Sequence, residues 1–98
     1  MNQVLKAIVI DDEPAARRLM KSLLLDHADV ISVIGEAGNG REAIAKIEEL
    51  KPDLIFLDIQ MPDLTGFEVI ERLSRKPNII FTTAYEQYAI KAFDTFSI

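Results

Sequence analysis

The residues best suited to chemistry are three aspartates that follow two apolar segments. Asp11 and Asp12 come directly after residues 7–10, and Asp58 comes directly after residues 54–57. Both segments are short and lack polar side chains, which is typical of parallel strands buried on both faces. Ligands of an open parallel sheet bind at the carboxyl ends of its strands. We therefore expect the three carboxylates to share one crevice.

This clustering predicts a bound cation. Three carboxylates in one crevice raise one another's pKa values unless a cation joins them. Mg²⁺ prefers oxygen ligands, keeps several waters, and is commonly held by one or two carboxylates together with a phosphate. We expect Asp12 and Asp58 to bind Mg²⁺, with Asp11 close by through water and the backbone carbonyl of Gln60 as a further ligand.

The arrangement leaves Asp58 available as a nucleophile. Mg²⁺ would screen the repulsion between Asp58 and an incoming phosphoryl group, which Asp58 would attack in line to become an acyl phosphate. Thr83 would donate its hydroxyl to a phosphoryl oxygen and pull the following loop inward. Taken singly, each acid could equally be a helix-capping or loop residue. Three acids that end two buried strands fit that interpretation poorly.

Alternating strand and helix patterns position these residues. The predicted strands are residues 7–10, 30–34, 54–57 and 78–82. The helices between and after them have apolar positions at Ala15, Ala16, Leu19, Met20, Leu23 and Leu24; at Ala43, Ile44, Ile47 and Leu50; at Phe67, Ile70 and Leu73; and at Tyr85, Tyr88, Ala89, Ala92 and Phe93. This repeated βα pattern predicts an α/β fold with a parallel sheet, right-handed crossovers and helices on both faces.

Capping and breaking residues mark the predicted helix ends. Pro14 suits the first turn of a helix, which Asp12 or Glu13 would cap. Asn39 and Gly40 form the next turn and cap, and Lys51 before a proline ends that helix. A capping box of Thr65 and Glu68 opens the third helix.

Composition limits the class of protein. The 98 residues are expected to form one domain, residues 1–98, with an ordinary apolar content of 49%. A net charge of −5 argues against general binding of nucleic acid or anionic membranes by this segment. The chain has no cysteine and no apolar run of membrane-spanning length. We expect a cytoplasmic domain without a membrane partner.

The sequence resembles the receiver domains of two-component response regulators over its whole length. The matching segments are Ile10-Asp11-Asp12-Glu13, Leu57-Asp58-Ile59-Gln60-Met61-Pro62, Thr65-Gly66 and Thr83-Ala84. The resemblance implies a flavodoxin-like, doubly wound sheet, with strand order 2-1-3-4 in this chain. It implies Asp58 as phosphoacceptor, Asp11 and Asp12 as the metal-binding pair, and Thr83 as the switch hydroxyl. The expected function is a signalling switch phosphorylated by a sensor histidine kinase, and not a turnover enzyme.

The segment from residue 81 to residue 93 resembles the LytTR-type transcriptional regulators, in which a DNA-binding domain follows the receiver. DNA contact is therefore expected only through a domain absent from this chain. Receivers also carry a lysine on a fifth strand, and this chain stops before that strand and the fifth helix. We expect metal binding to persist and phosphorylation to weaken, because one charge-assisted contact of roughly 1.5–3 kcal/mol is missing. The open fourth strand predicts a homodimer or an oligomer that exchanges elements.

Three other functions compete with this one. Residues 38–43 match the dinucleotide-binding pattern G-x-G-x-x-G/A, but Glu36 and Glu42 would flank a pyrophosphate with like charge. An aspartyl-phosphate hydrolase would normally place its nucleophile on the first strand in an Asp-x-Asp pattern. A receiver-like interaction module that is never phosphorylated is the remaining alternative, which the missing lysine favours.

Two smaller features carry little functional weight. His27 stands alone and is expected to be solvated or to cap a helix end. Arg17, Arg18 and Lys21 form a basic turn that we expect to be a solvated face of the first helix. The receiver resemblance adds that the first helix is a common kinase-docking surface.

Overall fold

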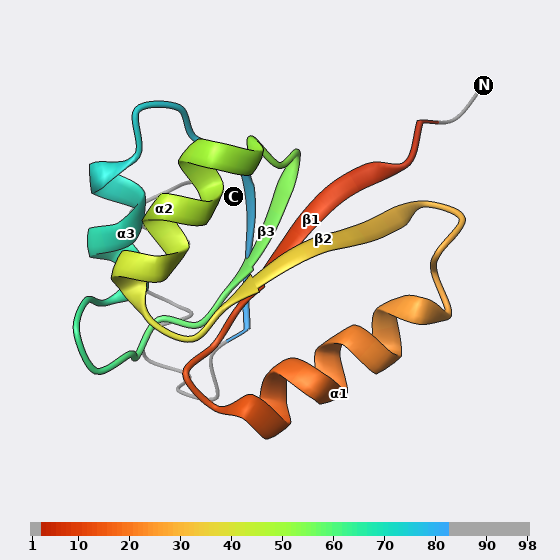
Figure 1. The fold of residues 1–98 in the computed structure, drawn as a ribbon, viewed down its shortest axis with the longest axis horizontal. Coiled ribbons are helices and arrows are strands. Elements are labelled where there is room, and N and C mark those ends of the chain that lie inside the picture. Colours follow the sequence, from red (N-terminus) through yellow and green to blue (C-terminus); the bar gives the residue numbers. More distant parts are fainter. Residues whose placement is uncertain (1–2, 83–98) are drawn as a thin grey trace.

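A computed structural model gives the fold of the chain and describes residues 3–82 (Figure 1). Strands and helices alternate through these residues. Their order is β1 (Leu5–Ile10), α1 (Pro14–Leu25), β2 (Ile31–Ala37), α2 (Gly40–Leu50), β3 (Leu54–Leu57), α3 (Gly66–Arg72) and β4 (Asn78–Phe81). The predicted helix at Tyr85 to Phe93 lies outside the described residues.

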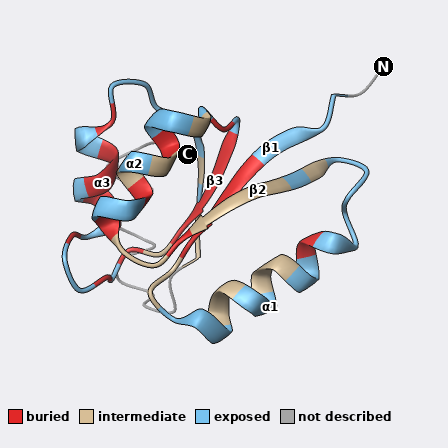
Figure 2. Ribbon diagram, in the orientation of Figure 1, coloured by how far each residue is buried: buried red, intermediate tan, exposed pale blue. Residues whose placement is uncertain are grey.

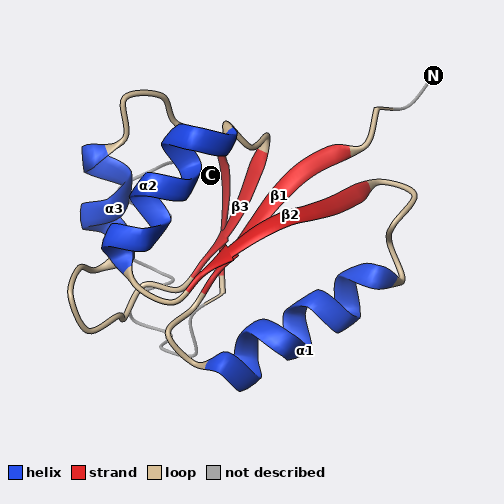
Figure 3. Ribbon diagram, viewed as in Figure 1, coloured by secondary structure: helices blue, strands red, loops and turns tan. Residues whose placement is uncertain are grey.

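The four described strands form one parallel sheet in the order β2-β1-β3-β4. Helix α1 covers one face of the sheet, and α2 and α3 cover the other (Figure 3). This is the flavodoxin-like arrangement that the sequence predicted, and the prediction of fold class is confirmed. Within the described sheet, β4 lies at one end, and its residue Ile80 is 46% exposed.

The hydrophobic core lies on both faces of the two central strands. Alternate residues of β1 point to opposite faces, so that Ile8 and Ile10 face α2 and α3, whereas Ala7 and Val9 face α1. All four are almost fully buried. The last four residues of β1 and all of β3 are buried, as Figure 2 shows. The acids that follow these two strands are therefore attached to a deeply buried part of the fold.

Strand β2 is longer than the sequence predicted. We expected it to end at Ile34, but it pairs with β1 as far as Ala37. The pairing continues across a bulge: Ala7 pairs with Val33 and the next residue of β1 pairs with Gly35, so that Ile34 is skipped. Because the pairing continues past the bulge, Glu36 lies at the same sheet edge as the aspartates.

Helix α1 departs from its predicted pattern in two ways. The expected apolar stripe is narrower, because Met20 and Leu24 pack against the sheet whereas Leu19 and Leu23 are 61% and 52% exposed. The predicted side-chain cap is also wrong. Glu13 occupies the N-cap position without a side-chain hydrogen bond, and its backbone N–H donates to the Asp11 carboxylate at 2.9 Å.

The other predicted helix ends are confirmed. The Asn39 side chain accepts a hydrogen bond from the backbone N–H of Glu42, and Lys51 ends α2 in the left-handed conformation with φ of 48°. Thr65 and Glu68 form the reciprocal capping box at the start of α3. Among the described residues, no helix has both the length and the apolar character needed to cross a membrane.

Candidate metal centre

The carboxyl ends of β1 and β3 lie side by side because hydrogen bonding continues past both strands. The backbone N–H of Asp11 donates to the Ala37 carbonyl at 3.1 Å, and that of Asp58 donates to the Ile10 carbonyl at 3.0 Å. These two bonds extend the sheet by one residue on each strand. They place the acids that follow β1 beside the acid that follows β3.

The structure brings Asp11, Asp12 and Asp58 together. One carboxylate oxygen of each lies within 4.8 Å of the others, and all three residues are partly buried. They line a cleft of about 600 Å³ that also includes Gln60 and Thr82. Gln60 is thus at the site, and its backbone N–H faces the Asp58 carboxylate at 3.4 Å. The predicted switch residue Thr83 lies outside the described residues.

The Asp58 carboxyl group has a raised pKa, about 6 against an ordinary value of 3.8. Burial is the main cause, and the negative charges of Asp11 and Asp12 act in the same direction. Hydrogen bonds from the backbone of Gln60 and Ile59 offset part of the effect. The charged form of Asp58 is therefore held in an unfavourable environment.

The donor set fits a hard divalent cation. Three carboxylates converge, and oxygen ligands are those that Mg²⁺ prefers. Among the described residues, the ion pairs are those of Glu36 with Arg17 and Lys21, so no basic side chain neutralises the three acids. Asp11, Asp12 and Asp58 would hold Mg²⁺, which would relieve their mutual repulsion.

The raised pKa gives a prediction about stability. The variant Asp58→Asn should unfold less readily than the wild type in EDTA, by about 1–2 kcal/mol at neutral pH after allowing for solvent screening. The pKa of Asp58 is higher in the folded state than in the unfolded state. The free energy of unfolding of the wild type therefore falls as pH rises from 3.8 through about 6. Asparagine does not ionise, so the difference should vanish near pH 3.8.

Urea unfolding of both proteins across this pH range measures the effect. Addition of Mg²⁺ should stabilise the wild type but not Asp58→Asn, because ligand binding to the folded state adds stability. An advantage of the variant that is constant with pH would show that ionisation of Asp58 is not its cause.

The competing dinucleotide pattern has another role. In dinucleotide-binding sites, the helix N-terminus receives the pyrophosphate. Here the N-terminus of α2 already binds the Asp63 carboxylate, which accepts hydrogen bonds from the backbone N–H groups of Gly40 and Arg41 at 2.8 and 2.9 Å. A Cβ atom on Gly40 would lie 2.6 Å from Cβ of Leu64. This glycine permits the start of α2 to pack closely against Leu64.

Ionisation of Asp63 is favoured by the same contacts. Desolvation alone would raise the pKa of this carboxyl group. The hydrogen bonds from the backbone of Gly40, Arg41 and Leu64 together outweigh it, so the pKa lies below its ordinary value. The carboxylate thus ties the loop after β3 to the start of α2.

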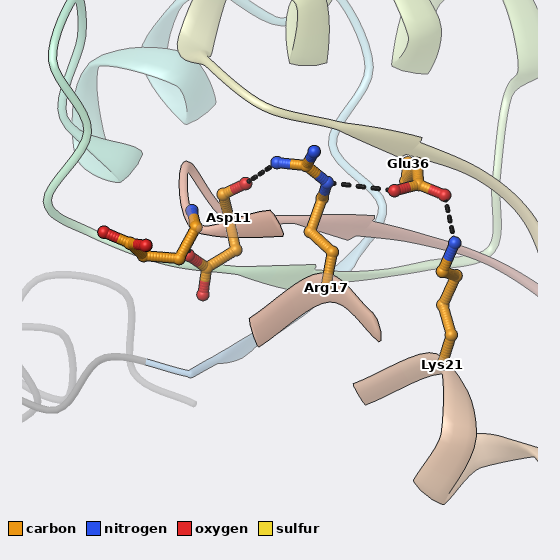
Figure 4. Close-up of polar contacts among 5 residues, drawn as sticks. Asp11, Arg17, Lys21 and Glu36 are labelled. Atoms are coloured by element: carbon orange, nitrogen blue, oxygen red, sulfur yellow. Dashed lines mark hydrogen bonds and ion pairs between the residues drawn. The ribbon is translucent and has the colours of Figure 1, made fainter. Parts of the chain in front are cut away.

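The basic residues of α1 are not all solvated. His27 and Arg18 are exposed as predicted, but the side chain of Arg17 is only 18% exposed. Arg17 and Lys21 both pair with Glu36 (Figure 4). The spacing of Arg17 and Lys21 places them on one helix face. Their partner Glu36 was not predicted, because the predicted strand ended before it.

Comparison with known proteins relates these features to one family. The sequence matches the response regulator receiver domain over residues 7–95. It is 50% identical over 93 residues to an uncharacterized response regulatory protein of Vibrio vulnificus, and 44% identical over 93 residues to the transcriptional regulatory protein BtsR of Salmonella typhi. Each match covers 93% of this chain, and the chain spans 38% of the length of each of these relatives.

A solved structure shares the fold. The response regulator domain of Thermotoga maritima CheB superposes with a TM-score of 0.81 at 33% sequence identity. The match covers 94% of this chain and 72% of the CheB chain. The sequence match and the backbone superposition therefore both relate the chain to response regulator domains.

Proposed function

The chain belongs to the response regulator receiver domain family, and from that premise we propose that it is a phosphoryl-accepting switch that is modified on Asp58. The observation that carries the proposal is the convergence of Asp11, Asp12 and Asp58 within 4.8 Å at the carboxyl ends of β1 and β3. A carboxylate among other acids is a poor acceptor of an anionic phosphoryl group unless a cation is present. The proposal therefore includes Mg²⁺ held by these three residues and by the backbone carbonyl of Gln60.

In this proposal, Asp58 provides the reacting atom. An oxygen of its carboxylate forms a bond to phosphorus, the bond from phosphorus to the donor breaks, and the donor leaves with the bonding electron pair. Mg²⁺ held by these residues would screen the negative charges of the Asp58 carboxylate and of the phosphoryl group. Asp58 must be ionised to attack. The backbone N–H of Gln60 donates a hydrogen bond to one oxygen of its carboxylate at 3.4 Å and so helps to orient it. Thr83 is proposed as the hydroxyl that binds the transferred phosphoryl group.

The partners follow from the same proposal. A sensor histidine kinase is the phosphoryl donor, and residues 1–98 act as one receiver domain in the cytoplasm. The switch is not a turnover enzyme, since Asp58 itself keeps the transferred group. Regulation of transcription is supported by the relative described as a transcriptional regulatory protein. Contact with DNA through a LytTR-type domain outside this chain rests on the resemblance of residues 81–93. Self-association through β4 is a further part of the proposal, supported by the 46% exposure of Ile80.

Phosphoryl transfer from acetyl phosphate tests the function. We expect the intact mass of the wild type to rise by one phosphoryl group in Mg²⁺ and to stay unchanged in EDTA. Asp58→Asn should show no gain, because the amide does not offer an anionic oxygen. Asp29→Asn is the matched control, since Asp29 is an exposed acid in the turn before β2, and it should behave as the wild type.

The outcomes separate the competing functions. No gain of mass together with measurable Mg²⁺ binding would favour an interaction module that is not phosphorylated. An equal gain in Asp58→Asn would place the acceptor elsewhere and contradict the proposal.

A further inference from the structure

Arg17 joins three parts of the chain beside the acidic cluster. Its Nε donates to Oε1 of Glu36 at 2.9 Å, and its Nη1 donates to the backbone carbonyl of Asp11 at 2.7 Å. Figure 4 shows the guanidinium group between these two acceptors. Helix α1 is thereby tied both to the loop that follows β1 and to the end of β2. One planar guanidinium can satisfy two acceptors in fixed directions, which a single ammonium group cannot do in the same way.

With the contact from Arg17, the backbone N–H, the carboxylate and the backbone carbonyl of Asp11 are all hydrogen-bonded. Its backbone N–H donates to the Ala37 carbonyl at 3.1 Å, and its carboxylate accepts from the Glu13 backbone N–H at 2.9 Å. The Arg17 guanidinium holds the remaining polar group, the carbonyl. This carbonyl belongs to the peptide that links Asp11 to Asp12. Its direction therefore sets how the chain delivers the second acid to the cluster.

Other residues around the Arg17 guanidinium support its two contacts. Lys21 also binds the Glu36 carboxylate. Hydrogen bonds from Lys21, and then from Arg17, lower the pKa of Glu36, so this anchor stays ionised. Gly38 leaves room on the other side, because a Cβ atom there would lie 3.0 Å from Nη1 of Arg17. The loop after β1 and the end of β2 can therefore both contact the Arg17 side chain of α1 in a single conformation.

We propose that Arg17 is a positioning residue for the metal centre and that it raises Mg²⁺ affinity by fixing the Asp11–Asp12 peptide. This inference rests on the proposed function, since it requires that the three acids bind Mg²⁺. Its sign distinguishes it from a purely electrostatic effect. A nearby positive charge repels Mg²⁺, so removal of Arg17 would tighten binding if charge alone mattered. Loss of the positioning contact should weaken binding instead.

The experiment compares Mg²⁺ dissociation constants measured by calorimetric titration. Arg17→Met should weaken binding by about 10-fold, the size of effect typical when a group that orients a metal ligand is removed. Arg17→Lys keeps the charge but not the fork, and it should also bind more weakly than the wild type. Arg18→Met is the matched control, because Arg18 is the exposed neighbour on α1 and the variant loses the same charge. Its affinity should stay within twofold of the wild-type value.

Each outcome decides between the two proposals. If the wild type fails to bind Mg²⁺, the proposed function itself is contradicted. If the wild type binds and Arg17→Met binds equally or more tightly, only the positioning role is wrong. If urea titration shows that Arg17→Met is not folded, the Mg²⁺ affinity of Arg17→Lys tests the positioning role. A wild-type affinity in that variant would overturn the inference.

Discussion

Replacing Gly66 with alanine should destabilise the fold by about 2–3 kcal/mol and weaken Mg²⁺ binding at the same time. An added Cβ atom would lie 2.8 Å from the backbone carbonyl oxygen of Asp58 and 3.1 Å from Cα of Ile59. Both are main-chain atoms, so relief of the clash requires movement of the segment that carries Asp58. The Gly66 backbone N–H is also bound to the Ile59 carbonyl at 2.7 Å, which opposes separation of the two segments.

Helix propensity predicts the opposite sign. Alanine is favoured over glycine in a helix interior by about 1 kcal/mol, and at the first position of α3 by less, so Gly66→Ala would be neutral or stabilising if α3 were isolated. The steric cost is larger because neither segment can rotate away as a side chain could. Urea unfolding in EDTA measures the stability, and calorimetric titration of the folded protein measures Mg²⁺ affinity.

Gly35→Ala is the matched control for this prediction. A Cβ atom on Gly35 would lie 3.1 Å from Cδ1 of Leu50, the far end of a flexible side chain. We expect a change in stability below about 1 kcal/mol and an unchanged Mg²⁺ affinity. Equal stability of Gly66→Ala and the wild type would contradict the close approach of α3 to Asp58.

Replacing Asp12 with asparagine should remove most Mg²⁺ binding, with a loss of at least about 100-fold in affinity. The carboxylate oxygen of Asp12 lies within 4.8 Å of those of Asp11 and Asp58, so the substitution removes one of three converging anionic ligands. An amide oxygen is neutral and attracts Mg²⁺ much less. Phosphoryl transfer to Asp58 from acetyl phosphate should fall with the loss of the metal.

The same substitution should have a second consequence that does not involve metal. Asp12 is one of the negative charges that raise the pKa of Asp58, although burial and Asp11 contribute more. In EDTA, Asp12→Asn should therefore be at least as stable as the wild type at neutral pH. A variant that loses Mg²⁺ binding because it is unfolded would show the reverse. Asp29→Asn, with the same change of net charge, should retain the wild-type affinity.

The parts of the fold that follow local rules could be predicted from the sequence. Residues 7–10 and 54–57 are continuous apolar segments, and they form the last four residues of β1 and the whole of β3 at the centre of the sheet. Thr65 and Glu68 have the spacing of a capping box, and both of its hydrogen bonds are present. Because these signals depend on a few neighbouring residues, tertiary contacts had little opportunity to override them.

The parts that depend on distant contacts could not be predicted in the same way. The bulge opposite Ala7 and Ile8 arises from pairing between strands, and β2 continues past it to Ala37, beyond the predicted end at Ile34. The exposure of Leu19 and Leu23 depends on how α1 crosses the sheet, which helical periodicity alone does not determine.

The acidic cluster was predictable because the carboxyl ends of parallel strands meet at one edge. Asp11, Asp12 and Asp58 come together for that reason, and the rule needs only the strand ends. The supporting contacts were not predictable. Arg17 acts on Asp11 through a backbone carbonyl, and a carbonyl has no signature in the sequence. The burial that raises the pKa of Asp58 to about 6 likewise depends on the packed structure.

The most direct test of the central claim is to locate the phosphoryl group after incubation with acetyl phosphate. Borohydride reduces an acyl phosphate to an alcohol with loss of phosphate, so a modified aspartate becomes homoserine, which peptide mass mapping can assign. We predict homoserine at position 58 in samples that contain Mg²⁺, and unmodified aspartate there in samples that contain EDTA. Homoserine at another acid, or at no position while Mg²⁺ binding is intact, would contradict the assignment of Asp58 as the acceptor.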